Sequence, residues 1–201
     1  MFGDILLGFE VLVRKGYIHR DIKPANVLVK GGHYKIADFG FACKADVLGR
    51  KKMNDICGTP IYMAPQLLRK IAYTAKSDIW SLGLILYELV FGYTPWPSRS
   101  LNEYLDKVYG KPLAFPYDAQ IGENTKDFMR RSLIIDEDQR MSWPEVFQHP
   151  LVNSRNVGHD APQINVNDYV KRILLRIQED VQRKNLNLNE ILEPYKCKSL
   201  S

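Results

Sequence analysis

Residues 78–91 constrain the fold more than any other stretch of this sequence. They are apolar on nearly every side of the helix that they are predicted to form, with Ser81 and Glu88 as interruptions. A helix of this kind belongs in the centre of a core, because a helix at the surface keeps a polar face. The apolar run is too short to cross a bilayer, so no membrane span is expected. The sequence therefore predicts a body built around one buried helix.

The rest of the pattern predicts further helices and a few short strands. Apolar residues recur at helical spacing in several segments, and short apolar runs flank a polar loop. Helices are expected near 5–13, 101–108 and 125–133, and strands at 17–19, 27–29 and 34–36, with a Gly31-Gly32 turn before the last strand. The predicted fold class is mainly α with a small β-hairpin region, an α+β arrangement.

Composition is typical of a soluble globular protein. The net charge of +5 is spread along the sequence with acids between the bases, so nucleic acid is not an expected partner. The three cysteines stand at no zinc-ligand spacing and are too few for a disulfide framework. The N-terminal residues lack the basic leader of a secretory signal. A cytoplasmic location is therefore expected.

The chain is predicted to consist of a domain and an appendage. The domain covers residues 1–152, because residues 153–167 are rich in Asn, Gly and Pro and show no period, as in a linker. Residues 168–201 are predicted to form an amphipathic C-terminal helix and a tail, with these apolar positions on one face: Val170, Ile173, Leu174, Ile177 and Val181. Such a stripe more often packs on its own domain, and the alternative is a partner protein bound through this helix.

Five short motifs follow one another within the predicted domain. Residues 19–26 are His-Arg-Asp-Ile-Lys-Pro-Ala-Asn, 38–40 are Asp-Phe-Gly, 58–60 are Gly-Thr-Pro, 64–65 are Ala-Pro, and 78–83 are Asp-Ile-Trp-Ser-Leu-Gly. In this order and at this separation they resemble the catalytic loop, the metal loop and the following segments of protein kinases. The resemblance covers about residues 2–152 and implies the large, mostly helical kinase lobe. It also implies ATP and Mg2+ as cofactors and a protein with a Ser or Thr acceptor as substrate.

The chemistry of phosphoryl transfer explains the residue types in these motifs. Transfer needs a positioned hydroxyl and compensation for the charge on the phosphate oxygens. By the resemblance, Asp21 orients the substrate hydroxyl, and Lys23 places a cation at the phosphate, as in serine/threonine rather than tyrosine kinases. Asn26 and Asp38 offer the hard oxygen ligands that Mg2+ prefers, and Thr59 is counted with the catalytic residues. The alternative for Lys23 is a solvated surface lysine.

Other residues of these motifs are implied to shape the site. Leu28 would form the floor beneath the adenine ring, and its alternative is a plain core leucine. His19, Phe39 and Asp78 resemble the lower part of the hydrophobic column that links the two kinase lobes. Within this column Asp78 is expected to bond the backbone of the catalytic loop. Gly40 completes the metal loop as a structural residue.

The segment after the metal loop departs from the family pattern. Residues 40–57 contain no Ser, Thr or Tyr, so phosphorylation is chemically excluded there. Asp55 stands where many relatives carry a phosphorylated threonine. Our hypothesis is that Asp55 pairs with Arg20 and supplies part of the ordering effect of a phosphate. The alternative is a solvated loop aspartate.

A second departure is Gln66, because most kinases have at this place a glutamate paired with a buried arginine, here expected to be Arg140. An amide accepts a hydrogen bond but does not neutralise a guanidinium, so this anchor is predicted to be weakened, and Gln66→Glu to raise the melting temperature. Together with segments 34–42, 76–84 and 94–97, Gln66 makes the chain look most like the autophagy-initiating serine/threonine kinases.

A third departure concerns the residues before His19. They contain no G-x-G-x-x-G loop, strand lysine or partner glutamate, all of which the family requires. The small lobe is therefore expected to be absent from this chain. Two functional hypotheses follow: a fragment of an active serine/threonine kinase, or a catalytically inactive large-lobe scaffold that binds a partner. The active-kinase hypothesis is favoured because the chain retains Asp21, Lys23, Asn26 and Asp38. The scaffold hypothesis is favoured because the small lobe is missing.

Overall fold

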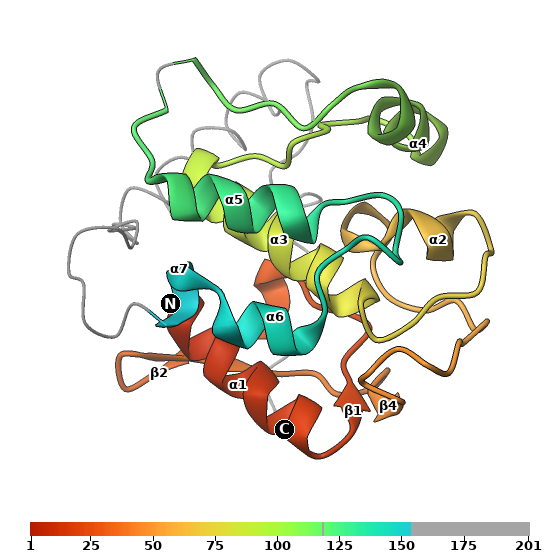
Figure 1. Cartoon of the computed structure of the whole chain (residues 1–201), viewed down its shortest axis with the longest axis vertical. Helices are drawn as coiled ribbons and strands as arrows, with labels where there is room; N and C mark the ends of the chain where they lie inside the picture. The colour runs from red at the N-terminus through yellow and green to blue at the C-terminus, as the bar shows by residue number, and fades with distance from the viewer. Residues whose placement is uncertain (118, 154–201) are drawn as a thin grey trace, which may run out of the picture. The chain divides into compact units, whose positions relative to one another are not determined.

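The structure is a computed structural model that describes residues 1–117 and 119–153 (Figure 1). The predicted C-terminal helix, and the predicted linker from residue 154 on, lie outside the described residues. Among the residues that are described, no helix is both long and apolar enough to span a bilayer.

The predicted buried helix is confirmed as α3 (Ser77–Phe91). Every residue from Ser77 to Tyr87 is buried, so this part of the helix has no solvent-facing side. Gly92 ends the helix with a left-handed φ of 80°, which glycine adopts without steric cost. The helix is therefore the centre on which neighbouring elements pack.

Helix α5 (Glu123–Ser132) lies along α3, as Figure 1 shows. The two backbones approach closely because residue 83 is glycine: a Cβ there would stand 2.2 Å from Ser132 Oγ. The N-terminal helix α1 (Phe2–Arg14) joins this core through aromatic rings. The ring of its Phe2 lies 5.5 Å from the ring of Phe128 in α5, measured between ring centroids.

Four further helices and two 3-10 turns complete the helical elements of the described residues. They are α2 (Pro65–Leu68), α4 (Leu101–Gly110), α6 (Trp143–Gln148) and α7 (Pro150–Asn153), with the 3-10 turns η1 (Pro24–Asn26) and η2 (Pro60–Tyr62). Helices predicted near 101–108 and 125–133 are confirmed as α4 and α5.

The predicted β-hairpin is confirmed as β2 (Val27–Lys30) paired antiparallel with β3 (His33–Ile36). Gly31 and Gly32 form its turn with φ of 59° and 79°, as two-residue hairpin turns require. The hairpin places the residues before β2 next to those that follow β3.

The strand predicted at 17–19 does not join this hairpin. Strand β1 (Tyr17–Ile18) instead pairs with β4 (Cys43–Lys44), which was not predicted. Each of these strands has two residues, too few to show an alternating pattern. Their pairing depends on contacts between distant segments.

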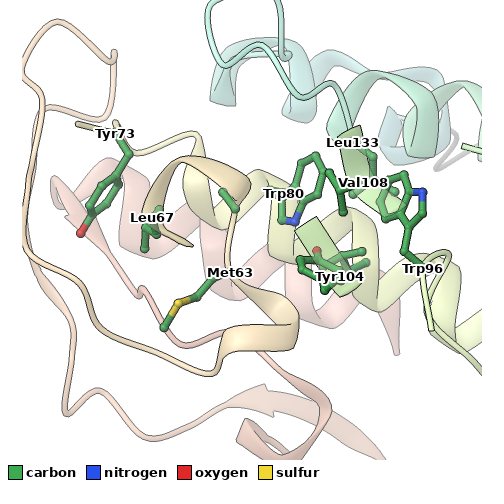
Figure 2. Packing of buried hydrophobic residues seen from close by; sticks show 10 residues of the cluster. Met63, Leu67, Tyr73, Trp80, Trp96, Tyr104, Val108 and Leu133 are labelled. Carbon is green, nitrogen blue, oxygen red and sulfur yellow. The ribbon is translucent and has the colours of Figure 1, made fainter. Parts of the chain in front are cut away.

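A hydrophobic cluster joins α3 to α2, α4 and the segments between them. Trp80 of α3 stacks on Trp96 with ring centroids 5.7 Å apart. Figure 2 shows members of this cluster, which are Met63, Ala64, Leu67, Tyr73, Trp80, Leu84, Trp96, Tyr104, Val108 and Leu133. Because Met63, Leu67 and Tyr73 come from the chain between η2 and α3, the cluster holds that segment on the central helix.

Candidate active site

Asp78 ties the loop between β1 and η1 to the start of α3. Its buried carboxylate accepts the amide N–H of His19 at 2.6 Å and that of Arg20 at 2.8 Å. Burial raises the pKa of Asp78, and these two hydrogen bonds oppose the shift. Arg20 has a left-handed φ of 71°, which a residue with a side chain keeps only when its surroundings hold it there. Asp78 therefore positions the loop.

Asp21, Lys23 and Thr59 form a closed ring of hydrogen bonds. Lys23 Nζ donates to Asp21 Oδ2 at 2.9 Å and to Thr59 Oγ1 at 2.7 Å, and Thr59 Oγ1 donates to Asp21 Oδ1 at 2.7 Å. Burial alone would raise the pKa of Asp21, but the bonds from Lys23 and Thr59 hold that pKa below its ordinary value. The carboxylate is therefore ionised at neutral pH and accepts hydrogen bonds.

Gly58 permits the approach that closes this ring. Its φ is 109°, and a Cβ at this position would stand 2.4 Å from the carbonyl oxygen of Arg20. Any other residue would push the backbone away from the loop that carries Arg20 and Asp21. The Gly-Thr order of the motif thus has a geometric reason, since only glycine brings Thr59 to Asp21.

Asn26 lies beside the residues that lead into Asp38. The amide N–H of Ala37 donates to the backbone oxygen of Asn26 at 2.8 Å. Asn26 Nδ2 donates to the backbone oxygen of Asp21 at 2.8 Å and to Asp21 Oδ2 at 3.1 Å, and its amide oxygen takes no part in these two bonds. The hairpin therefore brings the two predicted loops side by side.

Asp38 has a left-handed φ of 61°, and its Oδ1 accepts the amide N–H of Gly40 at 3.3 Å. A Cβ at position 40 would stand 3.2 Å from that same oxygen. Glycine at position 40 therefore leaves room for the carboxylate in this conformation.

The donor set of these two loops fits Mg2+. Asn26 offers an amide oxygen and Asp38 a carboxylate, both hard ligands. Within the described ranges, no group of three His, Cys, Asp or Glu side chains is placed to hold a metal ion. Mg2+ usually takes one or two carboxylates from a protein and completes its shell with water and substrate phosphates. The residues therefore suit a cation that binds together with a nucleotide.

Leu28 and Phe39 present apolar surface near these loops. Leu28 is 53% exposed and Phe39 50% exposed, so the alternative of a plain core leucine at position 28 is wrong. The ring of Phe39 lies 5.1 Å from the buried ring of His19, whose Nε2 is 3.1 Å from the backbone oxygen of Ala37. These contacts connect the Asp-Phe-Gly loop to the loop that carries Asp21.

Arg20 pairs with Asp55, which lies 35 positions further along the chain. Its Nε also donates to the backbone oxygen of Phe41 at 2.6 Å. Burial alone would lower the pKa of Arg20, but hydrogen bonds with Tyr73 and Asp55 raise it above its ordinary value. A single guanidinium thus contacts the segment after the metal loop at two places.

Gln66 accepts a hydrogen bond from Arg140, as expected, but Gln66 is one of several partners of Arg140. Arg140 donates to Gln66 Oε1 at 3.1 Å and to the backbone oxygens of Ile134 and Lys76 at 2.9 and 3.1 Å. Glu137 places its carboxylate 3.9 Å away. Burial lowers the pKa of Arg140 to about 10, and Glu137 opposes that shift.

Sequence reasoning missed two side chains that support the site. Glu137 supplies the carboxylate beside Arg140, and the hydroxyl of Tyr73 donates to the backbone oxygen of Asp55 at 2.8 Å. Neither residue belongs to a motif, and no periodicity marks it. Glu137 and Arg140 lie in a turn between α5 and α6, so no helical spacing could have indicated their contact.

The site thus combines an ionised carboxylate, held by a lysine and a hydroxyl, with a neighbouring asparagine on a helical domain. The family described as protein kinase domain matches residues 1–152. The chain belongs to the protein kinase family.

Its relatives are serine/threonine kinases. The chain is 35% identical over 153 residues to serine/threonine-protein kinase atg1 of Dictyostelium discoideum, covering 74% of this chain and 22% of that protein. It is 30% identical over 219 residues to serine/threonine-protein kinase ATG1 of Debaryomyces hansenii, covering 98% and 23%. It is 38% identical over 139 residues to serine/threonine-protein kinase 36 of Mus musculus, covering 69% and 10%. The chain thus spans less than a quarter of the length of these relatives.

Proposed function

We propose that this chain carries the phosphotransfer site of an ATP-dependent serine/threonine protein kinase, which moves the γ-phosphate of ATP to a protein hydroxyl. The observation that supports it best is the ring of Asp21, Lys23 and Thr59 beside Asn26. This ring combines an acceptor for a hydroxyl proton with a cation for the phosphate oxygens. Homologues that are serine/threonine kinases support the same activity.

Each residue has a separate task in this proposal. Asp21 accepts a hydrogen bond from the substrate Ser or Thr and orients its oxygen, while Thr59 keeps the carboxylate in place. Lys23 compensates negative charge on the transferring phosphate. Asn26 and Asp38 would hold Mg2+. Bound Mg·ATP supplies the phosphoryl group and neutralises charge that develops during transfer.

The nucleotide base is proposed to lie on the exposed side chain of Leu28. No glycine-rich loop precedes His19 in this sequence, so phosphotransfer is proposed for these residues in the context of a complete ATP site. We also propose that this chain is related to the Atg1 kinases and that it acts in the cytoplasm. Its kinase domain is proposed to end at residue 152.

The test is phosphotransfer from labelled ATP to Ser- and Thr-containing peptides by the full-length kinase. We expect Asp21→Asn to lower kcat by about 100-fold or more, because the acceptor for the hydroxyl proton is lost. Asp106→Asn, an exposed aspartate on α4, serves as the matched control and keeps the parent rate. Equal rates for Asp21→Asn and the parent protein would overturn the proposal. A parent protein that binds a partner but transfers no phosphate would support the scaffold function instead.

A further inference from the structure

Three side chains from distant segments meet near the catalytic loop: Arg20, Asp55 and Tyr73. Arg20 belongs to the loop that carries Asp21, Asp55 to the segment that carries Thr59, and Tyr73 to the connection between α2 and α3. The side chain of Arg20 is 11% exposed and that of Asp55 is 59% exposed. The guanidinium is thus fixed by its surroundings, whereas the carboxylate depends on its partners for a fixed position.

Tyr73 supplies the second partner of Asp55. Its hydroxyl donates to the backbone oxygen of Asp55 at 2.8 Å and lies 3.3 Å from Asp55 Oδ1. Two backbone hydrogen bonds also join Tyr73 to Met53, at 2.8 and 2.9 Å. The Tyr73 side chain is completely buried in the hydrophobic cluster on α3, so it forms a rigid support. The segment is therefore held at residues 53 and 55 from the core side.

Met53 and Asp55, which these contacts hold, lie shortly before Gly58 and Thr59 in the sequence. Asp55 is followed by Gly58, whose backbone lies against the carbonyl oxygen of Arg20, and by Thr59, whose hydroxyl donates to Asp21 at 2.7 Å. Only three residues, 56–58, separate Asp55 from Thr59, so the chain between them is short. Fixing Asp55 therefore limits where Thr59 can lie.

We propose that Tyr73 is a positioning residue of this kinase, and that Tyr73, Asp55 and Arg20 form a permanent latch that keeps Thr59 on Asp21 without phosphorylation. The inference rests on the proposed function. Residues 40–57 contain no hydroxyl that could be phosphorylated. The negative charge of the latch is therefore the carboxylate of Asp55, which is part of the amino-acid sequence. A carboxylate carries less charge than a phosphate and fewer acceptor oxygens. The hydrogen bond from Tyr73 to the backbone of Asp55 supplies additional order.

The experiment uses the full-length kinase with Tyr73→Phe, which removes one hydroxyl, and Asp55→Asn, which removes one charge. We expect each variant to lower kcat about tenfold while the KM for Mg·ATP stays unchanged, because misplaced catalytic groups cost rate rather than nucleotide binding. The double variant should lose less than the product of the two single effects, since both remove one latch. Asp55→Glu should restore part of the rate. Tyr109→Phe, on the exposed face of α4, is the control for loss of a tyrosine hydroxyl.

A protein phosphatase should leave the parent activity unchanged, whereas the activity of Asp55→Thr should require phosphorylation of the new threonine. Amide hydrogen exchange gives a readout that needs no activity: exchange in residues 53–59 should become about tenfold faster in Tyr73→Phe and not in Tyr109→Phe. Parent-like exchange and kcat in both latch variants would overturn the latch, and so would a parent inactivated by the phosphatase. If the parent transfers no phosphate but the exchange effect is present, the latch stands and the proposed function fails.

Discussion

The carboxylate of Glu137 lies 3.9 Å from the guanidinium of Arg140, and both side chains are buried. Glu137 also accepts the amide N–H of Thr74 with both oxygens, at 3.1 and 3.0 Å. The counter-charge for Arg140 thus comes from a neighbour in sequence and not from residue 66. This pair anchors the end of the segment that carries Thr59, because Arg140 also bonds Gln66.

Glu137→Gln should destabilise the domain by about 3 kcal/mol, because it leaves a buried guanidinium without its nearby carboxylate. A loss of that size lowers the melting temperature by roughly 6–12 °C in a domain of this length. Thermal unfolding followed by circular dichroism measures the change. Glu123→Gln, which removes an exposed ion pair with Arg130, is the control and should shift the melting temperature little. A similar small shift for Glu137→Gln would show that the neutral acceptors suffice.

Gln66→Glu should rescue part of the Glu137→Gln loss by moving the carboxylate to the other side of Arg140. In the parent protein the same change should give a smaller gain, because Glu137 already places a carboxylate 3.9 Å from Arg140. In both backgrounds the change also removes the hydrogen bond that Gln66 Nε2 donates to the backbone oxygen of Ile135 at 2.5 Å. Melting temperatures of the two single variants and the double variant test this. Equal gains in both backgrounds would contradict the explanation.

Gly58→Ala should lower kcat by about 100-fold, because its Cβ would stand 2.4 Å from the carbonyl oxygen of Arg20 and displace Thr59 from Asp21. The change also forces alanine to a φ of 109°. Steady-state kinetics of the full-length kinase measures the effect. Gly110→Ala is the matched control, since a Cβ there meets nothing within 4 Å. Unchanged kcat in Gly58→Ala would show that the close approach is not needed.

Gly83→Ala should destabilise the core by roughly 1–3 kcal/mol, because its Cβ would stand 2.2 Å from Ser132 Oγ and 2.9 Å from Ser132 Cβ. α3 and α5 would have to move apart. Urea unfolding gives the free energy. Ser132→Gly in the same chain removes both clashing atoms and should recover part of the loss. Gly3→Ala, in open space, should show no such cost.

Thr59→Ala should raise the pKa of Asp21, since it removes one of the hydrogen bonds that lower it. The folded-state pKa of Asp21 lies below the ordinary aspartate value of about 3.9. Its ionised form therefore adds stability above that value, and this contribution is lost as the pH falls through the folded-state pKa. In Thr59→Ala this contribution should be smaller, and its loss should be complete at a higher pH than in the parent protein.

Titration of the Asp21 carboxyl carbon by NMR measures that shift directly. Thr59→Ser keeps the hydroxyl and should keep the parent titration. An identical titration in Thr59→Ala would mean that Lys23 and Asn26 hold the carboxylate without Thr59.

Local pattern was enough to predict α3, the β2–β3 hairpin and the motif loops. The apolar residues of α3, the Gly31-Gly32 turn and the Asp-Phe-Gly triplet all lie within short stretches, where neighbouring residues decide conformation. The sequence also identified four candidate site residues, because phosphoryl transfer requires particular residue types at fixed spacing. They are Asp21, Lys23, Asn26 and Asp38. Their roles remain proposals that the experiments above test.

Tertiary structure alone decided the pairing of β1 with β4, the carboxylate beside Arg140 and the contact of Tyr73 with Asp55. The two strand segments and the Tyr73–Asp55 pair are separated along the chain by 18 residues or more, and no sequence period relates them. Which surface a residue contacts across such a distance depends on how the whole core packs around α3. The amino-acid sequence therefore determined which functional side chains the protein carries. Packing determined which other side chains hold them in place.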